Sequence, residues 1–221
     1  PFTHWGGLVS WKATDNVEVD AGLVNGWNGL ASPYSKANFL GRVRVKNDDN
    51  SFATTFAVVS GDEGNDFSPL FQPAPPLTSA NRTRYSLILE ARPTNRVEYV
   101  FHQWLGTQSD GAPLGGTALW TGIDQYLYYS VSKEWKAGAR FEWFQDTDGT
   151  RVGLNRPSNP NKPPLPGNYF SLTVGPNYLP TENLLIRPEL RWDFYSGDAL
   201  PYNDGTKTQQ LMLGFDMILK F

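Results

Sequence analysis

Strict alternation between apolar and charged side chains is the feature of this sequence that most restricts its fold. In the segment IRPELRWDFY at 186–195, one set of alternate positions is apolar: Ile186, Pro188, Leu190, Trp192 and Phe194. The positions between them are all charged: Arg187, Glu189, Arg191 and Asp193. Successive side chains of a β-strand point to opposite faces, whereas a helix would spread these charges around its axis. The segment is therefore predicted to be a strand with one apolar and one charged face.

The same period of two recurs along the chain. Arg42, Arg44 and Lys46 alternate with valines in GRVRVK at 41–46. WKAGARFEWF at 135–144 and LMLGFDMILKF at 211–221 also carry charges in mid-strand opposite an apolar face. In an ordinary soluble sheet the apolar face covers a core and the charged face meets bulk water. The connections between strands are needed to decide which solvent lies on each side.

Alternation bounded by turn residues predicts about eleven strands, most of them near the length of roughly 9–11 residues that a tilted strand needs to cross a bilayer. Their predicted ranges are 4–13, 17–26, 38–46, 52–60, 84–92, 96–105, 118–131, 135–145, 168–178, 184–195 and 208–221. No helix is predicted, because the remaining segments are rich in Gly, Pro, Asn, Asp and Ser.

Every second connection between these strands is short. The short turns lie at 14–16, 47–50, 93–95, 133–134 and 180–183, and the long segments lie at 27–37, 61–83, 106–117, 146–167 and 196–207. Nothing imposes this parity on a soluble meander, whereas outer-membrane barrels have tight periplasmic turns and longer extracellular loops. The parity therefore favours a membrane barrel. The length of segments 61–83 and 146–167 permits them to fold into the lumen, without requiring it.

Aromatic residues concentrate near strand ends. They are Trp5, Trp11, Trp27, Tyr85, Tyr99, Trp104, Trp120, Trp135, Trp143, Tyr178, Trp192 and Phe221. Aromatics at both strand ends are typical of the girdles at the two membrane interfaces, although any one of them also suits the core of a soluble sandwich. The residues predicted to form a girdle are Trp11, Trp135, Trp143, Tyr178, Trp192 and Phe221.

Composition excludes several other classes of protein. The net charge of −3 gives no excess of basic residues for a nucleic-acid partner. The absence of cysteine and the presence of only two histidines argue against a metal centre, and no cofactor is predicted. The chain has no run of roughly 18 apolar residues that would form a membrane helix. It opens at Pro1 with no export signal, which is expected to have been removed or to lie outside this sequence.

These patterns together predict an all-β, antiparallel, up-and-down transmembrane β-barrel that forms a single domain over 1–221. Lipid would cover the apolar faces and a water-filled lumen would meet the charged faces, because only a closed barrel satisfies every backbone group in hydrocarbon. The predicted pore-lining residues are Arg42, Arg44, Lys46, Glu90, Arg140, Glu142, Arg187, Glu189, Arg191, Asp193 and Asp216. Their charges nearly cancel, which predicts passage of small hydrophilic solutes or ions with weak ion selectivity.

The direction of the first and last strands bears on barrel closure. Strands 4–13 and 208–221 both run toward the short-turn rim, so direct pairing between them would be parallel. Bacterial single-chain barrels have even numbers of antiparallel strands. The chain is therefore expected to be the C-terminal part of a larger barrel.

Three stretches carry a resemblance to a known family: WTGIDQYLYYSVSKEWKAGARFEWFQDTDGTRVG at 120–153, LLIRPELRWDF at 184–194 and DGTKTQQLMLGFDMILKF at 204–221. They resemble the outer-membrane β-barrel porins of the porin-2 type found in planctomycetes and other Gram-negative-type bacteria. The resemblance is densest over 95–221. It implies a diffusion channel in the bacterial outer membrane, in contact with the lipid bilayer, and a role for Phe221 like that of the C-terminal aromatic residue recognised during assembly. Family members are longer, which also implies missing N-terminal strands.

Alternative functions remain open at this stage. A soluble carbohydrate-binding barrel or sandwich would use tryptophan platforms, and it predicts aromatics lining a cleft rather than a belt. An enzyme is not predicted, since Ser86, Glu90 and His102 are the only constellation that resembles a catalytic site. Arg42, Arg44 and Lys46 would either form a local anion site or pair with carboxylates on neighbouring strands. A homo-oligomer is possible, with no interface signature in the sequence.

Overall fold

Eleven β-strands make up the regular structure of the chain in a computed structural model that describes residues 4–27, 36–64, 79–112, 115–152 and 165–221. They are β1 (Gly6–Lys12), β2 (Val17–Asn25), β3 (Ala37–Lys46), β4 (Phe52–Asp62), β5 (Asn81–Thr94), β6 (Val97–Gln108), β7 (Ala118–Ser130), β8 (Trp135–Asp146), β9 (Gly167–Thr181), β10 (Leu184–Ser196) and β11 (Gln209–Leu219). No helix long and apolar enough to cross a bilayer occurs in the described parts of the chain.

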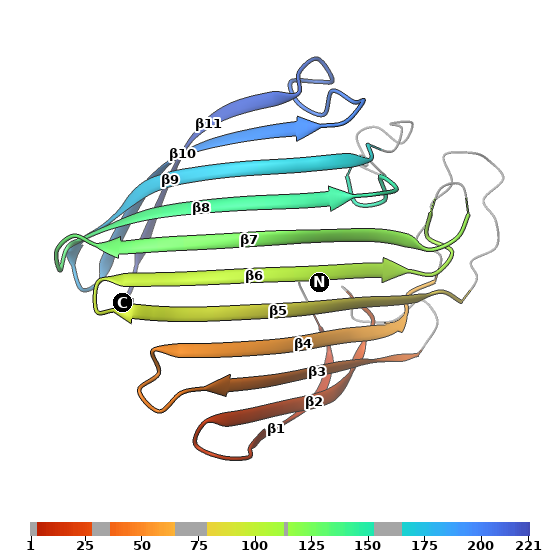
Figure 1. Cartoon of the computed structure of the whole chain (residues 1–221), viewed down its shortest axis with the longest axis horizontal. Coiled ribbons are helices and arrows are strands. Elements are labelled where there is room, and N and C mark those ends of the chain that lie inside the picture. The colour runs from red at the N-terminus through yellow and green to blue at the C-terminus, as the bar shows by residue number, and fades with distance from the viewer. Residues whose placement is uncertain (1–3, 28–35, 65–78, 113–114, 153–164) are drawn as a thin grey trace.

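The strands form one sheet in which each strand pairs with the next along the chain, from β1 to β11. Every pairing is antiparallel. Figure 1 shows the sheet as a single curved layer, with the short turns gathered at one end and the long connections at the other. We name these the short-turn end and the long-loop end. The predicted all-β, antiparallel, up-and-down arrangement is confirmed.

Several strand boundaries differ from those predicted. β5 begins at Asn81 and continues through Thr94, so the predicted turn at 93–95 lies partly inside the strand. β9 continues to Thr181 because its ladder with β10 reaches Leu184, with a register shift between Leu184 and Ile186. The described sheet does not close on itself: β1 and β11 are its two edges and run in the same direction.

Side chains at the short-turn end explain why these connections are tight. The side chain of Asn47 accepts a hydrogen bond from the backbone N–H of Phe52 at 2.9 Å, and Asp49 accepts one from Ser51 at 2.9 Å. The bond from Ser51 lowers the pKa of the Asp49 carboxyl. Asn50 has a φ of 56°, a left-handed conformation that asparagine tolerates better than most residues. The Asn-Asp-Asp-Asn sequence therefore encodes its own turn.

The pairing register separates the side chains into two faces. One face, the outer face, presents an apolar side chain on every strand, and all of these are exposed except the partly buried Phe101 on β6: Val9, Leu23, Phe39, Phe56, Tyr85, Phe101, Leu127, Phe141, Leu172, Leu190 and Leu213. Leu213 is 84% exposed and Val9 is 71% exposed. The opposite, inner face contains most of the buried polar residues, including Thr173 and Asp193. This is the reverse of a soluble sheet, in which apolar side chains are the buried ones.

Candidate functional site

The residues predicted to line a pore all lie on the inner face. Directly opposed positions in the ladders alternate between the two faces, and the inner-face set contains Arg42, Arg44, Lys46, Glu90, Arg140, Glu142, Arg187, Glu189, Arg191, Asp193 and Asp216. The sheet thus brings together charges that are more than a hundred residues apart in sequence. That they line a water-filled pore remains a prediction.

Most of these charges are bound in ion pairs between strands. On β3, Arg42 pairs with Asp20 and with Glu18, whose Oε2 lies 3.3 Å from Nη2. Arg44 Nη1 lies 2.5 Å from Glu90 Oε2, reaching across β4 to β5. Two of the three basic residues in the 42–46 segment therefore have carboxylate partners. This arrangement supports the pairing interpretation over a local anion site.

A second network connects β8, β10 and β11. Oε2 of Glu142 lies 3.1 Å from Nε of Arg140 and 3.2 Å from Nη1 of Arg191. Arg191 Nε also lies 2.7 Å from Asp193 Oδ1, and Arg187 pairs with Asp216 on the neighbouring strand. One carboxylate, that of Glu142, thus pairs with two guanidinium groups.

Replacing Glu142 with glutamine is expected to shift ion selectivity toward anions, because it leaves Arg140 and Arg191 with less negative charge nearby. The loss of folding stability is expected to stay below about 1 kcal/mol, since partly exposed ion pairs contribute little. The reversal potential in a salt gradient measures the first effect and urea titration measures the second. An unchanged reversal potential would show that this network does not face the ion path.

His102 has a different partner from the one expected. Its Nδ1 lies 3.1 Å from Oδ2 of Asp124, which also accepts a hydrogen bond from Trp104 Nε1 at 3.2 Å. No hydrogen bond joins His102 to Ser86 among the described residues, and Glu90 is paired with Arg44. The constellation of Ser86, Glu90 and His102 is therefore not assembled for proton transfer in this structure.

The inner face also carries an aromatic row toward the long-loop end, which sequence reasoning missed. Ring centroids lie 5.4 Å apart for Trp104 and Phe144, 6.0 Å for Phe144 and Tyr169, and 4.9 Å for Tyr169 and Tyr195. Trp104, one of the aromatic residues near strand ends, thus lies on the inner face. Trp104 lies two residues from His102 on the same strand, so strand parity alone places both on one face.

Arginines stack on the tryptophans of this region. The guanidinium carbon of Arg84 lies 4.9 Å from the Trp104 ring centroid. That of Arg151 lies 3.9 Å from the Trp120 centroid, and Trp120 is only 4% exposed on the inner face. Trp120, also near a strand end, is thus a buried residue of the inner face. Both arginines were absent from the predicted site because neither belongs to a run of alternating charges.

Parts of the long connections fold over the inner face. Asp146 ends β8 and is fully buried, and its carboxylate accepts backbone N–H bonds from Thr150, Arg151 and Val152 at 3.0, 2.7 and 2.9 Å. The aspartate thereby holds the segment that follows it, 147–152, in a turn above the inner face. Arg151 of this segment then reaches Trp120.

Gln108 joins this segment to a second connection. Its Oε1 accepts hydrogen bonds from Arg151 Nη2 at 2.7 Å and from Arg82 Nε at 2.8 Å. Its Nε2 donates to the carbonyl oxygen of Gly64 at 2.6 Å. Gln108 is fully buried, so these bonds are shielded from water. The described beginnings of segments 61–83 and 146–167 are thus both fastened to the inner face.

A third connection, after β10, follows the same pattern. Tyr202 is half-buried, and burial raises the pKa of its hydroxyl to about 12. The hydroxyl of Tyr195 donates to the carbonyl oxygen of Pro166 at 2.5 Å, tying the end of β10 to the start of β9.

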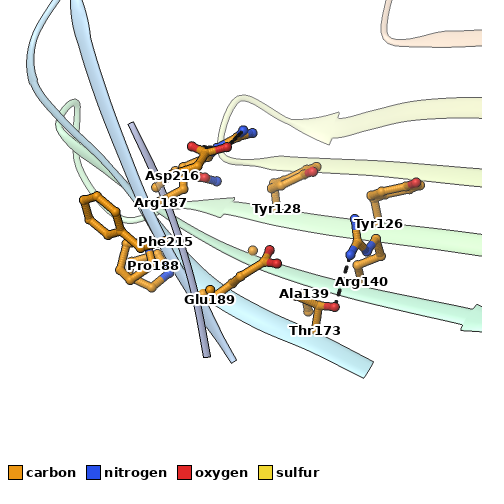
Figure 2. A pocket seen from close by; sticks show the side chains of 15 residues that line it. Tyr126, Tyr128, Ala139, Arg140, Thr173, Arg187, Pro188, Glu189, Phe215 and Asp216 are labelled. Atoms are coloured by element: carbon orange, nitrogen blue, oxygen red, sulfur yellow. Dashed lines mark hydrogen bonds and ion pairs between the residues drawn. The ribbon is translucent and has the colours of Figure 1, made fainter. Parts of the chain in front are cut away.

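A hollow lies on the inner face toward the short-turn end, between β7 and β11 (Figure 2). Its volume is about 440 Å³. The side chains that line it include Tyr126, Tyr128, Arg140, Thr173, Arg187, Glu189 and Asp216. Three glycines, Gly138, Gly175 and Gly214, also border it. The hollow thus combines aromatic rings, paired charges and bare backbone.

The predicted girdle residues lie in two groups at opposite ends of the sheet. Trp11, Trp135, Tyr178 and Phe221 lie near the short-turn end, where the rings of Trp135 and Tyr178 stack at 4.2 Å. Trp143 and Trp192 lie toward the long-loop end. Trp143 Nε1 donates to Asn168 Oδ1 at 2.9 Å, and Trp192 Nε1 donates to Gln209 Oε1 at 3.1 Å. Apolar rings with polar tips at two levels are the arrangement expected of residues at membrane–water interfaces.

A curved antiparallel sheet with an apolar exposed face and a charged inner face is typical of outer-membrane β-barrels, the class that includes the porins. The sequence profile of the family described as "Putative beta-barrel porin-2, OmpL-like" matches residues 1–221. The chain belongs to this family.

A search of curated protein sequences returned no match. One solved structure, a FadL homologue from Pseudomonas aeruginosa, is similar at 14% sequence identity with a TM-score of 0.49. The match covers 96% of this chain and 65% of that protein, so the chain spans less than two thirds of its length.

Proposed function

We propose that the protein is an outer-membrane porin through which small hydrophilic solutes diffuse passively, with weak ion selectivity. The observation that carries this proposal is the two-sided sheet. Its outer face is apolar on every strand and exposed on all of them except β6, and its inner face holds charges of both signs. Burying the outer face in lipid removes a large apolar surface from water, and the inner face then meets an aqueous lumen.

The charge arrangement supports weak selectivity. Inner-face arginines are balanced by carboxylates, as in the pairs of Arg44 with Glu90 and of Arg187 with Asp216. Strong selectivity in channels requires a ring or cluster of one sign. Opposite charges on facing walls instead hold ordered water and slow apolar solutes.

The bacterial outer membrane is the proposed location, and its lipid bilayer is the main partner of the outer face. The six girdle residues support this, because they form two levels of aromatic side chains that match the two interfaces of a bilayer. The eleven predicted pore-lining residues are proposed to face the solutes. We propose no catalytic activity and assign no oligomeric state.

A soluble carbohydrate-binding protein is the rival interpretation. It requires the apolar face to be covered by a second layer of protein, and the described strands form a single layer. It also requires open tryptophan platforms, whereas Trp120 on the inner face is buried beneath Arg151. Membership in a porin family favours the channel.

Single-channel recording of the natively purified protein in a planar bilayer tests the proposal. Stable ohmic steps with a reversal potential near zero in a salt gradient are expected. A protein that stays soluble without detergent and produces no conductance would contradict it. A large reversal potential with otherwise normal steps would retain the channel and overturn weak selectivity.

A further inference from the structure

Two features of the sequence, a pair of prolines and a set of three glycines, form the floor of the hollow between β7 and β11. Pro176 and Pro188 occupy facing positions on β9 and β10, and neither has a backbone N–H to donate. No β9–β10 pair forms between Ile186–Tyr178 and Leu190–Val174 in the described sheet. The ladder between β9 and β10 is thus interrupted at Pro188. The interrupted ladder leaves backbone polar groups without strand partners at this point of the wall.

Glycines keep this floor open. A Cβ atom at Gly175 would lie 2.3 Å from the carbonyl oxygen of Pro188, and one at Gly214 would lie 3.0 Å from Cγ of Glu189. One at Gly138 would lie 3.2 Å from the ring of Tyr128. Side chains at these positions would therefore fill the hollow or displace its lining. The cavity exists because three inner-face positions carry no side chain.

The charges around the hollow largely neutralise one another. Arg187 pairs with Asp216, and Arg140 pairs with Glu142 while donating to Thr173 Oγ1 at 3.3 Å (Figure 2). Glu189 has no ion-pair partner among the described residues, and Figure 2 shows it extending toward the side where Arg140 and Tyr128 lie. The hollow therefore offers one carboxylate acceptor among groups that already have partners.

We propose that this hollow is a binding site for a neutral polyhydroxylated solute of monosaccharide size, a proposal that rests on the porin function. Volumes of roughly 300–1,000 Å³ are usual for small-molecule sites, and the hollow holds about 440 Å³. Tyr126 and Tyr128 supply flat apolar surface for the C–H face of a sugar ring. Glu189, Asn177 and the freed backbone groups supply hydrogen-bonding partners for its hydroxyls.

A charged solute suits the site less well. A cation near Glu189 would also meet the guanidinium groups of Arg187 and Arg140, and an anion would meet Glu189 and Asp216. Hydroxyl groups can donate to the carboxylate and accept from other groups at once. The lining thus favours a solute with many hydroxyls and no net charge.

Current recordings in the presence of glucose and of maltose test this site. Each sugar is expected to interrupt the wild-type current reversibly, with a dependence on concentration that saturates. Tyr128→Ala is expected to weaken apparent affinity about fivefold through loss of the ring. Glu189→Gln is expected to weaken it about tenfold through loss of charged hydrogen bonds. Ile88→Ala, on the inner face of β5 outside the hollow, is the matched control and should retain wild-type affinity.

The outcomes separate this proposal from the porin function. Normal conductance that neither sugar interrupts beyond its effect on viscosity would overturn the binding site and leave the porin intact. Equal affinities for all variants would also overturn the site. If the protein does not conduct, saturation-transfer NMR measures glucose binding to the protein folded in detergent. Binding that depends on Glu189 would support the binding site without a channel. Absence of binding would overturn both the binding site and the porin function.

Discussion

Replacing Asp146 with alanine is expected to release the 147–152 segment from the inner face and to increase single-channel conductance. The fully buried carboxylate accepts three backbone N–H bonds, and alanine provides no acceptor for them. Each buried donor left without a partner costs about 1–3 kcal/mol, so the turn is expected to open rather than retain its geometry. Arg151 then leaves Trp120 and the long-loop end widens.

Conductance and limited proteolysis measure this release together, since an open segment becomes accessible to protease. Asp146→Asn preserves the side-chain volume and one carbonyl acceptor, and it should give an intermediate result. Asp198→Ala removes the same charge from an exposed position in the next long connection and should behave as wild type. Unchanged conductance and unchanged cleavage in Asp146→Ala would show that the segment does not restrict the lumen.

Arg151→Ala provides a second test in case the Asp146 variant assembles poorly. It removes the stacking on Trp120 and the hydrogen bond to Gln108 but leaves the three N–H bonds to Asp146 in place. A wider channel with an intact turn is expected. A conductance equal to that of wild type would place Arg151 outside the ion path.

An arginine in place of Phe101 is expected to impair folding into a bilayer severely, whereas an arginine in place of Val100 is not. These neighbours on β6 lie on opposite faces: Phe101 is on the outer face between Leu89 and Gln125, and Val100 is on the inner face between Glu90 and Tyr126. A lipid-facing arginine near the bilayer midplane costs about 2–4 kcal/mol. On the inner face the same side chain meets water and the carboxylate of Glu90.

Urea titration of protein folded into lipid vesicles compares the two variants directly. The substitution is the same and the positions are adjacent, so local strand propensity and distance along the barrel are nearly matched. Equal destabilisation of both variants would contradict the assignment of the faces. A larger loss of folding stability in Val100→Arg than in Phe101→Arg would reverse the assignment of the two faces. It would require an interior filled with protein in place of a lumen.

The inner-face chemistry depends on interactions that alternation does not specify. Sequence reasoning placed Arg42, Arg44 and Glu142 on one face, but it did not reveal which carboxylate each basic group meets. Arg44 reaches Glu90 across the intervening β4, and Glu142 serves Arg140 and Arg191 at once. These partners depend on the register of several strands and on side-chain length.

What the sequence determined by itself is local in origin. A period of two encodes the faces of each strand, turn residues such as Asn47 and Asp49 encode the tight connections, and the alternation of short and long connections encodes an up-and-down sheet. The tertiary structure alone decided that Trp104 and Trp120 stack with arginines, that Asp146 holds a loop segment over the inner face, and that two prolines and three glycines meet to form a hollow. The physical reason is that these contacts join residues from different strands, whose relative position is set only when the whole sheet is paired.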